Sequence, residues 1–467
     1  MSPLSVEVDD LDSSGRGVGR SQGKVVFIAG ALPGEEALFR RIRRTRNYDE
    51  AVVEKLLSVS ADRVEPRCPY YSRCGGCTLQ HLSYDAQVRH KERQLTTTLR
   101  KIGGVVPSKI MPPLTFDPWR YRRKARFGAR HVPRKEGVLV GFRERQPRRI
   151  TDMKDCEILA DPLGGLIAPL RDLIGGLKAA ARIPQIEAAA GDEGSLLVIR
   201  HLDPLAFEDI EAIDAFAAEK GIGIWLQPAG PTSAAPRPLA ADRLEYALAI
   251  PDGESDDESS AIDAQGLSGG LQAQEGASLR FRFSPLDFTQ INAGVNRLLV
   301  QRVLGMVRPR PGLRIIDAFC GIGNFALPMA AAGARVTGLE FGSEMVARAK
   351  ENAAANHLSA AFEEADLENE EAVRHWLGQG WDAIVIDPPR AGAATLVEHI
   401  DLAAPKRIVY VSCNPGTLAR DAARLQAQAY SLARVGIADM FAHTAHIEAV
   451  AEFLPSNERA ESVRPKR

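Results

Sequence analysis

The chain has 467 residues, of which 45% are hydrophobic and 25% are charged, and its formal net charge is -1. These values are ordinary for folded globular protein, and the length predicts two or three domains. No apolar run approaches the length of a membrane span, and the acidic N-terminus lacks the apolar stretch of a signal peptide, so we expect a cytoplasmic protein with no membrane partner.

The near-zero net charge conceals a separation of charges along the chain. Arginine and lysine dominate residues 120–149, and a second basic cluster lies at residues 40–46. Acidic residues collect at 252–258 and 363–371. Two basic clusters in the N-terminal third favour a polyanionic partner, such as a nucleic acid, over a merely solvated charged surface.

Short strands separated by glycine turns are predicted for the first sixty or so residues. The composition is typical of strands at residues 24–29, 36–42 and 48–58. Several short strands at this spacing predict a small all-β barrel resembling the OB fold over residues 1–60. The basic cluster would then lie on the face that binds an oligonucleotide.

Residues 61–280 are expected to form a central α+β domain. Apolar residues recur at helical spacing in 82–102, where a helix would pack on the C-terminal domain and end at Gly103-Gly104. The further predicted elements are strands with a basic face (121–150), a helix (163–177) and two strands (195–202 and 223–227). Residues 228–238 and 253–278 are rich in proline, glycine, serine and acid, which predicts loops or a hairpin tip without chemistry.

The C-terminal part, residues 281–460, alternates between strands and helices from Gly312 onwards. The predicted strands are 314–318, 335–340, 383–387 and 407–412, and the predicted helices are 325–332, 343–356, 394–402 and 416–427. This alternation is typical of an α/β, Rossmann-like domain with a doubly wound parallel sheet.

A glycine turn joins the first of these strands to its helix. Residues 317–325, DAFCGIGNF, contain two glycines that let a ligand approach the backbone, and Glu340 closes the next strand where an acid binds ribose hydroxyls. The third glycine of a dinucleotide-binding turn is missing, which favours S-adenosylmethionine, a nucleoside cofactor without phosphate. Asp366 follows a third strand, where it is placed to receive the adenine amino group, and Asp387 ends a fourth strand beside the expected cleft.

The strand at 407–412 ends in Cys413, and Asn414-Pro415 must turn the chain at once. Carboxyl ends of strands carry the ligand sites of open α/β sheets. A thiol near a helix N-terminus is expected to have a lowered pKa. We therefore interpret Cys413 as a reactive thiolate, and Cys320 as a buried packing residue.

A thiolate in a methyltransferase indicates methylation at C5 of a pyrimidine. C5 is a poor nucleophile, but addition of a thiolate to C6 makes an enolate whose C5 attacks a methyl sulfonium. A base must then take the C5 proton so that the thiolate can leave. Glu448 is the candidate base, because alternation places it with His446 on one face of a late strand; the alternative is a surface acid on an edge strand.

Four further cysteines lie in the N-terminal half. Cys68, Cys74 and Cys77 form a C-x5-C-x2-C segment, and Cys156 follows at a distance. Because disulfides are disfavoured in the cytosol, these thiols predict a metal centre. The spacing permits either zinc or an iron–sulfur cluster.

Together these motifs resemble the RNA uracil-C5 methyltransferase family. The matching stretches are FTQIN at 288–292, the turn at 317–325, DPPR at 387–390, SCNP at 412–415 and HIEAV at 446–450. The resemblance implies that Cys413 is the nucleophile and Glu448 the base. It also implies that the S-adenosylmethionine and target-base sites are lined by Gln290, Phe319, Asn324, Glu340, Asp366 and Asp387.

The N-terminal features resemble the branch of this family that acts on 23S ribosomal RNA. Residues 5–60 look like a TRAM domain, a small RNA-binding barrel, and the tRNA-directed branch typically lacks both this domain and the cysteines. The resemblance implies a [4Fe-4S] cluster held by Cys68, Cys74, Cys77 and Cys156. We expect the cluster to be structural and to orient RNA, and the protein to be a monomer.

Three other functions compete with this hypothesis. The same chemistry could act on tRNA or on more than one ribosomal site. A non-catalytic RNA-binding assembly factor could keep the fold, but the presence of Cys413 and Glu448 argues against it. A radical S-adenosylmethionine enzyme needs a C-x3-C-x2-C cluster with an open iron site, whereas the first spacing here is five residues.

Overall fold

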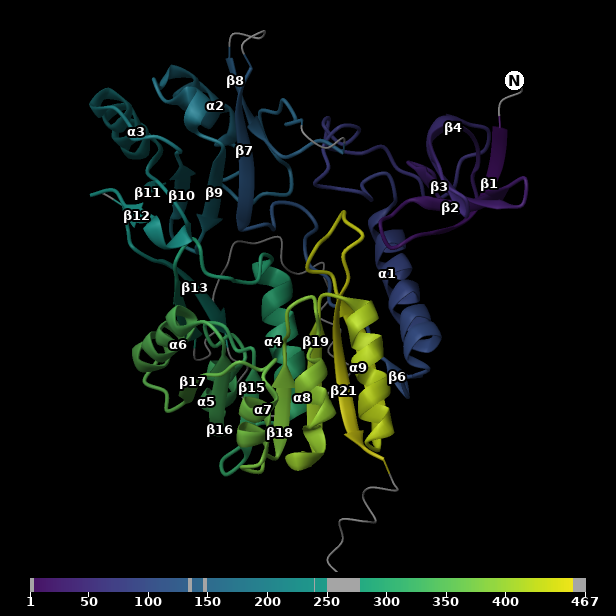
Figure 1. The fold of residues 1–467 in the computed structure, drawn as a ribbon, viewed down its shortest axis with the longest axis vertical. Coiled ribbons are helices and arrows are strands. Elements are labelled where there is room, and N and C mark those ends of the chain that lie inside the picture. Colours follow the sequence, from purple (N-terminus) through teal and green to yellow (C-terminus); the bar gives the residue numbers. More distant parts are fainter. Residues whose placement is uncertain (1–3, 133–136, 146–148, 239, 250–277, 457–467) are drawn as a thin grey trace, which may run out of the picture.

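The computed structural model describes residues 4–132, 137–145, 149–238, 240–249 and 278–456. Along the chain these residues form an N-terminal barrel, a central lobe and a C-terminal α/β domain (Figure 1). No helix in these ranges is long and apolar enough to cross a membrane. The loop predicted at 253–278 lies outside the described residues, apart from Ser278.

The N-terminal barrel is closed, with the strand order β1-β2-β3-β5-β4. Its strands are β1 (Leu4–Leu11), β2 (Gly17–Ser21), β3 (Lys24–Ala29), β4 (Glu36–Arg44) and β5 (Tyr48–Leu56). Apolar residues at alternate positions, such as Val6, Val26 and Ile28, fill its interior. The predicted barrel is confirmed.

The central lobe contains a sheet with the order β12-β11-β10-β9-β7-β8. Its strands are β7 (Lys124–Val132), β8 (Gly137–Gly141), β9 (Gln185–Ala190), β10 (Ser195–Arg200), β11 (Gly223–Gln227) and β12 (Ala235–Pro236), and its helices are α2 (Ile167–Gly176) and α3 (Phe207–Lys220). The segment 228–238, predicted as a loop, contains β12, which pairs with β11. The sequence had not indicated α3.

The C-terminal domain is built on an eight-stranded sheet with the order β17-β16-β15-β18-β19-β21-β20-β6. Its strands are β6 (Lys109–Ile110), β15 (Arg314–Ala318), β16 (Arg335–Glu340), β17 (Ala361–Glu364), β18 (Ala383–Ile386), β19 (Arg407–Ser412), β20 (Tyr430–Ala438) and β21 (Glu448–Pro455). The first five strands of this order are parallel, but β21 is antiparallel to both β19 and β20. The predicted doubly wound parallel sheet is confirmed for these five strands, and the antiparallel β21, which the sequence analysis did not specify, extends it.

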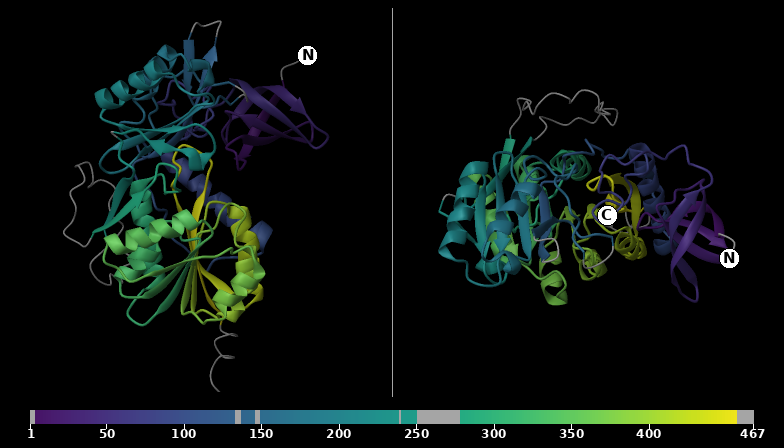
Figure 2. Two further views of the ribbon diagram at one scale, coloured as in Figure 1. Left: turned by 60° about the vertical axis from the view of Figure 1, so that its left-hand side comes forward. Right: turned by 90° about the horizontal axis from the view of Figure 1, so that it is seen from above.

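Helices cover both faces of this sheet (Figure 2). They are α4 (Ala293–Val307), α5 (Ala326–Ala331), α6 (Ser343–Ala355), α7 (Glu370–Leu377), α8 (Ala394–Glu398) and α9 (Pro415–Ala427). The hairpin of β13 (Leu244–Ala249) and β14 (Ser278–Phe283) lies between the central lobe and this domain (Figure 1).

One helix from the N-terminal half also belongs to this domain by its packing. Helix α1 (Tyr84–Thr98) continues into a π-helical turn (Leu99–Gly103) and lies beside α9 (Figure 1). Its Val88, Leu95 and Leu99 share one apolar cluster with residues of the eight-stranded sheet. The carboxyl ends of the parallel strands face the central lobe, so ligand sites are expected between the two.

Candidate active site

The register of two strands brings Cys413 next to Glu448. Strand β19 ends at Ser412, which pairs with Ala449 of the antiparallel β21. The position after Ser412 therefore lies opposite Glu448, the first residue of β21. The predicted nucleophile and the predicted base thus meet at the edge where the parallel strands end.

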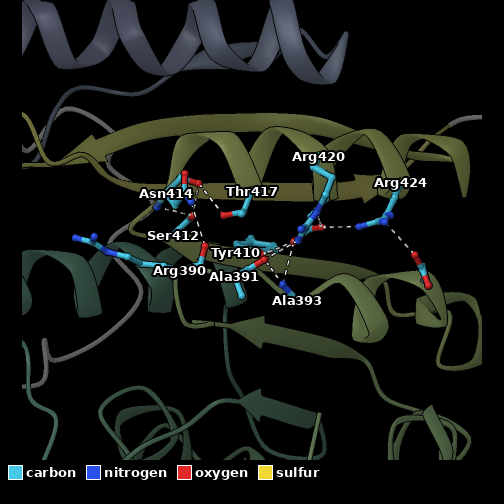
Figure 3. A network of polar contacts seen from close by, with 11 residues as sticks. Arg390, Ala391, Ala393, Tyr410, Ser412, Asn414, Thr417, Arg420 and Arg424 are labelled. Carbon is cyan, nitrogen blue, oxygen red and sulfur yellow. Dashed lines mark hydrogen bonds and ion pairs between the residues drawn. The ribbon is translucent and has the colours of Figure 1, made fainter. Parts of the chain in front are cut away.

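The turn that carries Cys413 is fixed by side-chain hydrogen bonds (Figure 3). The Asn414 side chain caps α9 by accepting a hydrogen bond from the Gly416 amide (3.0 Å), and its Nδ2 donates to the carbonyl of Arg390 (3.1 Å). The Ser412 hydroxyl donates to the Asn414 carbonyl (3.0 Å). These bonds leave the thiol on a rigid turn at the start of a helix.

The same network ties the segment after β18 to α9 (Figure 3). The buried carboxylate of Asp421 accepts hydrogen bonds from the Tyr410 hydroxyl (2.8 Å) and the Ala393 amide (3.0 Å). Arg420 bonds the same carboxylate (3.1 Å) and the carbonyl of Ala391 (2.9 Å). The backbone around Arg390 is thereby positioned independently of any ligand.

The Cys413 thiol lies in a partly buried and largely acidic environment. Burial raises the pKa of this thiol, the carboxyls of Glu448 and Asp387 raise it further, and the guanidinium of Arg390 lowers it. The lowered pKa expected from the sequence is therefore wrong for this structure, because burial and two carboxyls outweigh the helix terminus.

Asp387 and Glu448 are two buried carboxyls whose charges act on each other. Burial raises the pKa of Asp387 to about 7. Burial and the nearby Asp387 raise the pKa of Glu448 well above its usual range, while Arg390 opposes this rise. Carboxyls this close do not readily ionise together. The pair is therefore able to hold a proton at neutral pH.

His446 does not share the face of Glu448, contrary to the alternation expected from the sequence. The strand begins only at Glu448, so His446 lies in the preceding loop and is exposed. Its Nδ1 lies 3.3 Å from Nη2 of Arg390. Arg390, which the sequence analysis left without a role, is thus the cation common to Cys413, Glu448 and His446.

Three predicted cofactor residues meet at the glycine turn after β15. Phe319 has a φ of 63°, a left-handed conformation uncommon for a residue with a side chain and typical of sites held by their surroundings. The Glu340 carboxylate accepts hydrogen bonds from the amides of Gly321 and Gly342 (3.1 Å each). Asn324 lies on the helix side of this turn, and its side chain forms hydrogen bonds with Asn296 and Tyr246.

Asn324 is held by residues that sequence reasoning missed. Its side chain exchanges hydrogen bonds with that of Asn296 in α4 (2.9 and 3.0 Å), and its oxygen accepts one from the Tyr246 hydroxyl (3.2 Å). Gln290 lines a small pocket that also includes Tyr246 and Asn296. No sequence motif marks Tyr246, because it comes from the separate β13–β14 hairpin.

The remaining predicted cofactor residues follow neighbouring strands. Asp366 comes after β17, is exposed, and accepts a hydrogen bond from the Glu368 amide (2.9 Å). Strands β17, β16, β15 and β18 are adjacent in the sheet. Asp366, Glu340, Phe319 and Asp387 therefore lie in this order along the same edge, beside Cys413.

The other four cysteines surround a separate cavity. Cys68, Cys74, Cys77 and Cys156 line a space of about 210 Å³ in the central lobe. Burial raises the pKa of Cys77 and of Cys156 to about 12. Within the described ranges, no group of three or more histidine, cysteine or acidic side chains is arranged to hold a metal ion. The predicted cluster thus stays a prediction.

Three cations at the start of the basic segment, Arg122, Arg123 and Lys124, make contacts within the protein. Arg122 donates from Nε to the carbonyl of Lys124 (2.9 Å), and Arg123 pairs with Asp192 (2.6 Å). Lys124 is partly buried and bonded to the carbonyl of Asp287, and burial lowers its pKa to about 8. Each of these three cations makes at least one contact within the protein, and the polyanion-binding surface expected in this basic segment stays a prediction.

Comparisons with known proteins cover both ends of the chain. A family model described as tRNA (Uracil-5-)-methyltransferase matches residues 253–454, and a TRAM domain model matches residues 2–38. The 23S rRNA (uracil(1939)-C(5))-methyltransferase RlmD of Thiobacillus denitrificans is 44% identical over 97% of this chain and 100% of its own length. The protein of the same name from Hahella chejuensis is 41% identical over 96% of this chain and 97% of its own length.

A solved structure shows the same fold over almost the whole chain. The Pyrococcus abyssi tRNA (uracil-54, C5)-methyltransferase, in complex with S-adenosyl-L-homocysteine, matches with a TM-score of 0.69 at 23% identity. The match covers 96% of this chain and 99% of the archaeal one.

Proposed function

The chain belongs to the 23S ribosomal RNA (uracil-C5)-methyltransferase family, and we propose that it catalyses the reaction of this family. The protein transfers the methyl group of S-adenosylmethionine to C5 of a uracil in 23S ribosomal RNA. The target is the uridine for which the relatives are named, position 1939. The observation that supports this function is the placement of Cys413 opposite Glu448, at the strand ends that also carry the glycine turn.

Cys413 and Glu448 act at successive steps. The Cys413 thiolate adds to C6 of the uracil, and the electrons of the C5–C6 double bond move towards the C4 carbonyl. C5 then attacks the methyl group that S-adenosylmethionine supplies, the bond between this methyl group and sulfur breaks, and S-adenosylhomocysteine is the leaving group. Glu448 accepts the proton from C5, the double bond forms again, and the bond between Sγ and C6 breaks.

The charges around the site fit this sequence of steps. Glu448 acts in its ionised form, with the proton of the pair on Asp387, and a raised pKa makes that carboxylate a stronger base. The Arg390 guanidinium favours the thiolate of Cys413, against the opposing effect of the two carboxyls. Proton sharing between Asp387 and Glu448 limits the negative charge that the thiolate faces.

The cofactor is held along the strand ends. Glu340 accepts hydrogen bonds from the ribose hydroxyls, and Asp366 accepts one from the adenine amino group. The cofactor and target-base sites are completed by Gln290, Phe319, Asn324 and Asp387.

The four cysteines of the central lobe are assigned to a [4Fe-4S] cluster. They line a common cavity, and four cysteine thiolates are the ligand set that holds a [4Fe-4S] cluster. Such a cluster would join Cys156 to the segment 68–77 and leave no open ligand position. Its role is therefore structural, and the protein is taken to act as a monomer.

The test uses a 23S ribosomal RNA fragment, whole tRNA and S-adenosylmethionine with a radioactive methyl group. The protein should form 5-methyluridine at position 1939 of the fragment and leave tRNA unmodified; methylation of tRNA alone would refute the target assignment. Cys413→Ala should abolish the product, while Cys320→Ala, which alters a thiol packed under the glycine turn, should retain it. Product formed by Cys413→Ala at the normal rate would refute the nucleophile.

Glu448→Gln provides the second arm of the test. Without the base, methylation at C5 can proceed but the adduct cannot resolve, so RNA should stay bound to the protein after denaturing electrophoresis. If the Glu448→Gln variant released methylated RNA without accumulating this adduct, the assignment of Glu448 as the base would be refuted.

A further inference from the structure

The loop 439–447 delivers Glu448 to the site. It joins β20 to β21 and extends towards the central lobe, beside the upper end of α1 (Figure 1). The loop has no regular secondary structure. Its conformation must therefore be set by contacts with other segments, and these come from residues more than 300 positions earlier in the chain.

Helix α1 holds the loop at two points. Nζ of Lys91 lies 2.6 Å from Oδ1 of Asp439 and 3.0 Å from the carbonyl oxygen of Phe441. The two charged side chains are only 1% and 0% exposed. One turn earlier, the side-chain oxygen of Gln87 accepts a hydrogen bond from the His443 amide (2.9 Å).

The segment that follows Cys77 holds the loop from a second direction. The amides of Thr78 and Leu79 both donate to the carbonyl of His443 (2.9 Å each). The Thr78 hydroxyl accepts a hydrogen bond from the Ala445 amide (3.1 Å). Gln87 joins the two sets of contacts, because its Nε2 donates to the carbonyl of Leu79 (3.1 Å).

The backbone at the centre of these contacts is in an unfavourable conformation. His443 has a φ of 63°, and residues with side chains keep such a conformation only where their surroundings enforce it. Its ring lies 4.1 Å from the ring of Trp119, centroid to centroid, and the Tyr121 hydroxyl donates to the neighbouring Ala442 carbonyl (3.0 Å). The loop would not be expected to keep this shape without its partners.

We propose that Thr78, Leu79, Gln87 and Lys91 form a positioning clamp that holds Glu448 within reach of the C5 proton. The clamp acts on proton removal and release of the RNA, and not on formation of the adduct. This separation follows because Cys413 is fixed by a different network, through Ser412 and Asn414. The inference rests on the proposed role of Glu448 as the base.

The test compares Gln87→Met and Lys91→Met with Gln94→Met as a matched control. Gln94 lies on the same helix, but its Nε2 donates to the carbonyl of Leu11 in the barrel (2.8 Å) and not to the loop. Single-turnover reactions with the 23S ribosomal RNA fragment would follow two quantities, the covalent protein–RNA adduct and the released methylated RNA. Rates are normalised to the fraction of protein that binds S-adenosylhomocysteine.

The clamp variants should form the adduct at nearly the normal rate and release methylated RNA about tenfold to a hundredfold more slowly, as small displacements of a catalytic group do. The adduct should therefore accumulate, as in Glu448→Gln, and Gln94→Met should behave as the unaltered protein. Because Lys91→Met leaves Asp439 buried without its partner, Gln87→Met decides the outcome if Lys91→Met does not fold.

Three results would overturn the clamp: unchanged release in Gln87→Met, slower turnover without accumulated adduct, or equal accumulation in Gln94→Met. A failure of the underlying function would look different. In that case Glu448→Gln itself would accumulate no adduct.

Discussion

Replacing Arg390 with methionine should raise the pKa of the Cys413 thiol and slow methylation at neutral pH. Arg390 lowers the pKa of this thiol, whereas burial, Glu448 and Asp387 raise it. Its backbone is bonded to Asn414, the residue next to the thiol, so its position does not depend on RNA. Methionine keeps the length of the side chain and removes its charge.

The size of the effect follows from Coulomb's law. Two unit charges 4 Å apart interact by about 1 kcal/mol in water and by about 4 kcal/mol at the effective dielectric of a protein surface. Arg390 is exposed, so solvent screening favours the lower part of this range, about 1 to 2 kcal/mol. One pKa unit corresponds to about 1.4 kcal/mol. We expect the thiol pKa to rise and the thiolate fraction at neutral pH to fall about tenfold.

The assay is kcat/KM for methyl transfer to the RNA fragment between about pH 6.5 and 9.5, a range that brackets the ordinary thiol pKa. Activity needs the thiolate, so it is lost as the pH falls through the thiol pKa. The deficit of Arg390→Met should therefore be largest at low pH and shrink as the pH rises. Arg424→Met is the matched control, because Arg424 pairs with Glu398 and Asp421 and is not among the charges that shift the thiol. An equal deficit at every pH would refute the electrostatic reasoning and indicate a lost RNA contact.

Three further outcomes are expected. The double variant Arg43→Ala and Arg44→Ala removes two exposed charges of the barrel. It should reduce the slope of log binding constant against log salt concentration by about two units. Arg41→Ala should have little effect, because Asp49 already pairs with Arg41 (2.7 Å). Glu340→Ala should weaken S-adenosylmethionine binding about tenfold or more in calorimetry, because the amide of Gly321 in the glycine turn and the amide of Gly342 lose their acceptor. Cys77→Ser should lower the iron content of the purified protein without changing S-adenosylmethionine binding, and unchanged iron would contradict the cluster.

The backbone of the C-terminal domain was largely predictable from the sequence. The predicted strands at 314–318, 335–340 and 407–412 coincide with β15, β16 and β19. Each has a largely buried centre and a polar residue at its first position, followed by a helix, and this alternation depends mainly on local sequence. The positions of Glu340 and Cys413 follow from it, because both stand at strand ends.

The electrostatics of the site were not predictable in the same way. The raised pKa values of Cys413 and Glu448 depend on the pairing of β19 with β21, and the direction of β21 is not encoded in any local pattern. Alternation also placed His446 wrongly, because the strand begins two residues later than the pattern suggests. The roles of Tyr246 and Lys91 arise from contacts between segments far apart in the chain.

The contact between Gln87 and His443 has a consequence for synthesis of the protein. The two residues are 356 positions apart. Translation delivers the N-terminal segments first, and domains fold as they emerge. Lys91 of helix α1 therefore has no counter-charge until the loop 439–447 has left the ribosome. A chain truncated before the loop 439–447 would lack not only Glu448 but also Asp439, the counter-charge for Lys91, so such incomplete chains should be unstable as well as inactive.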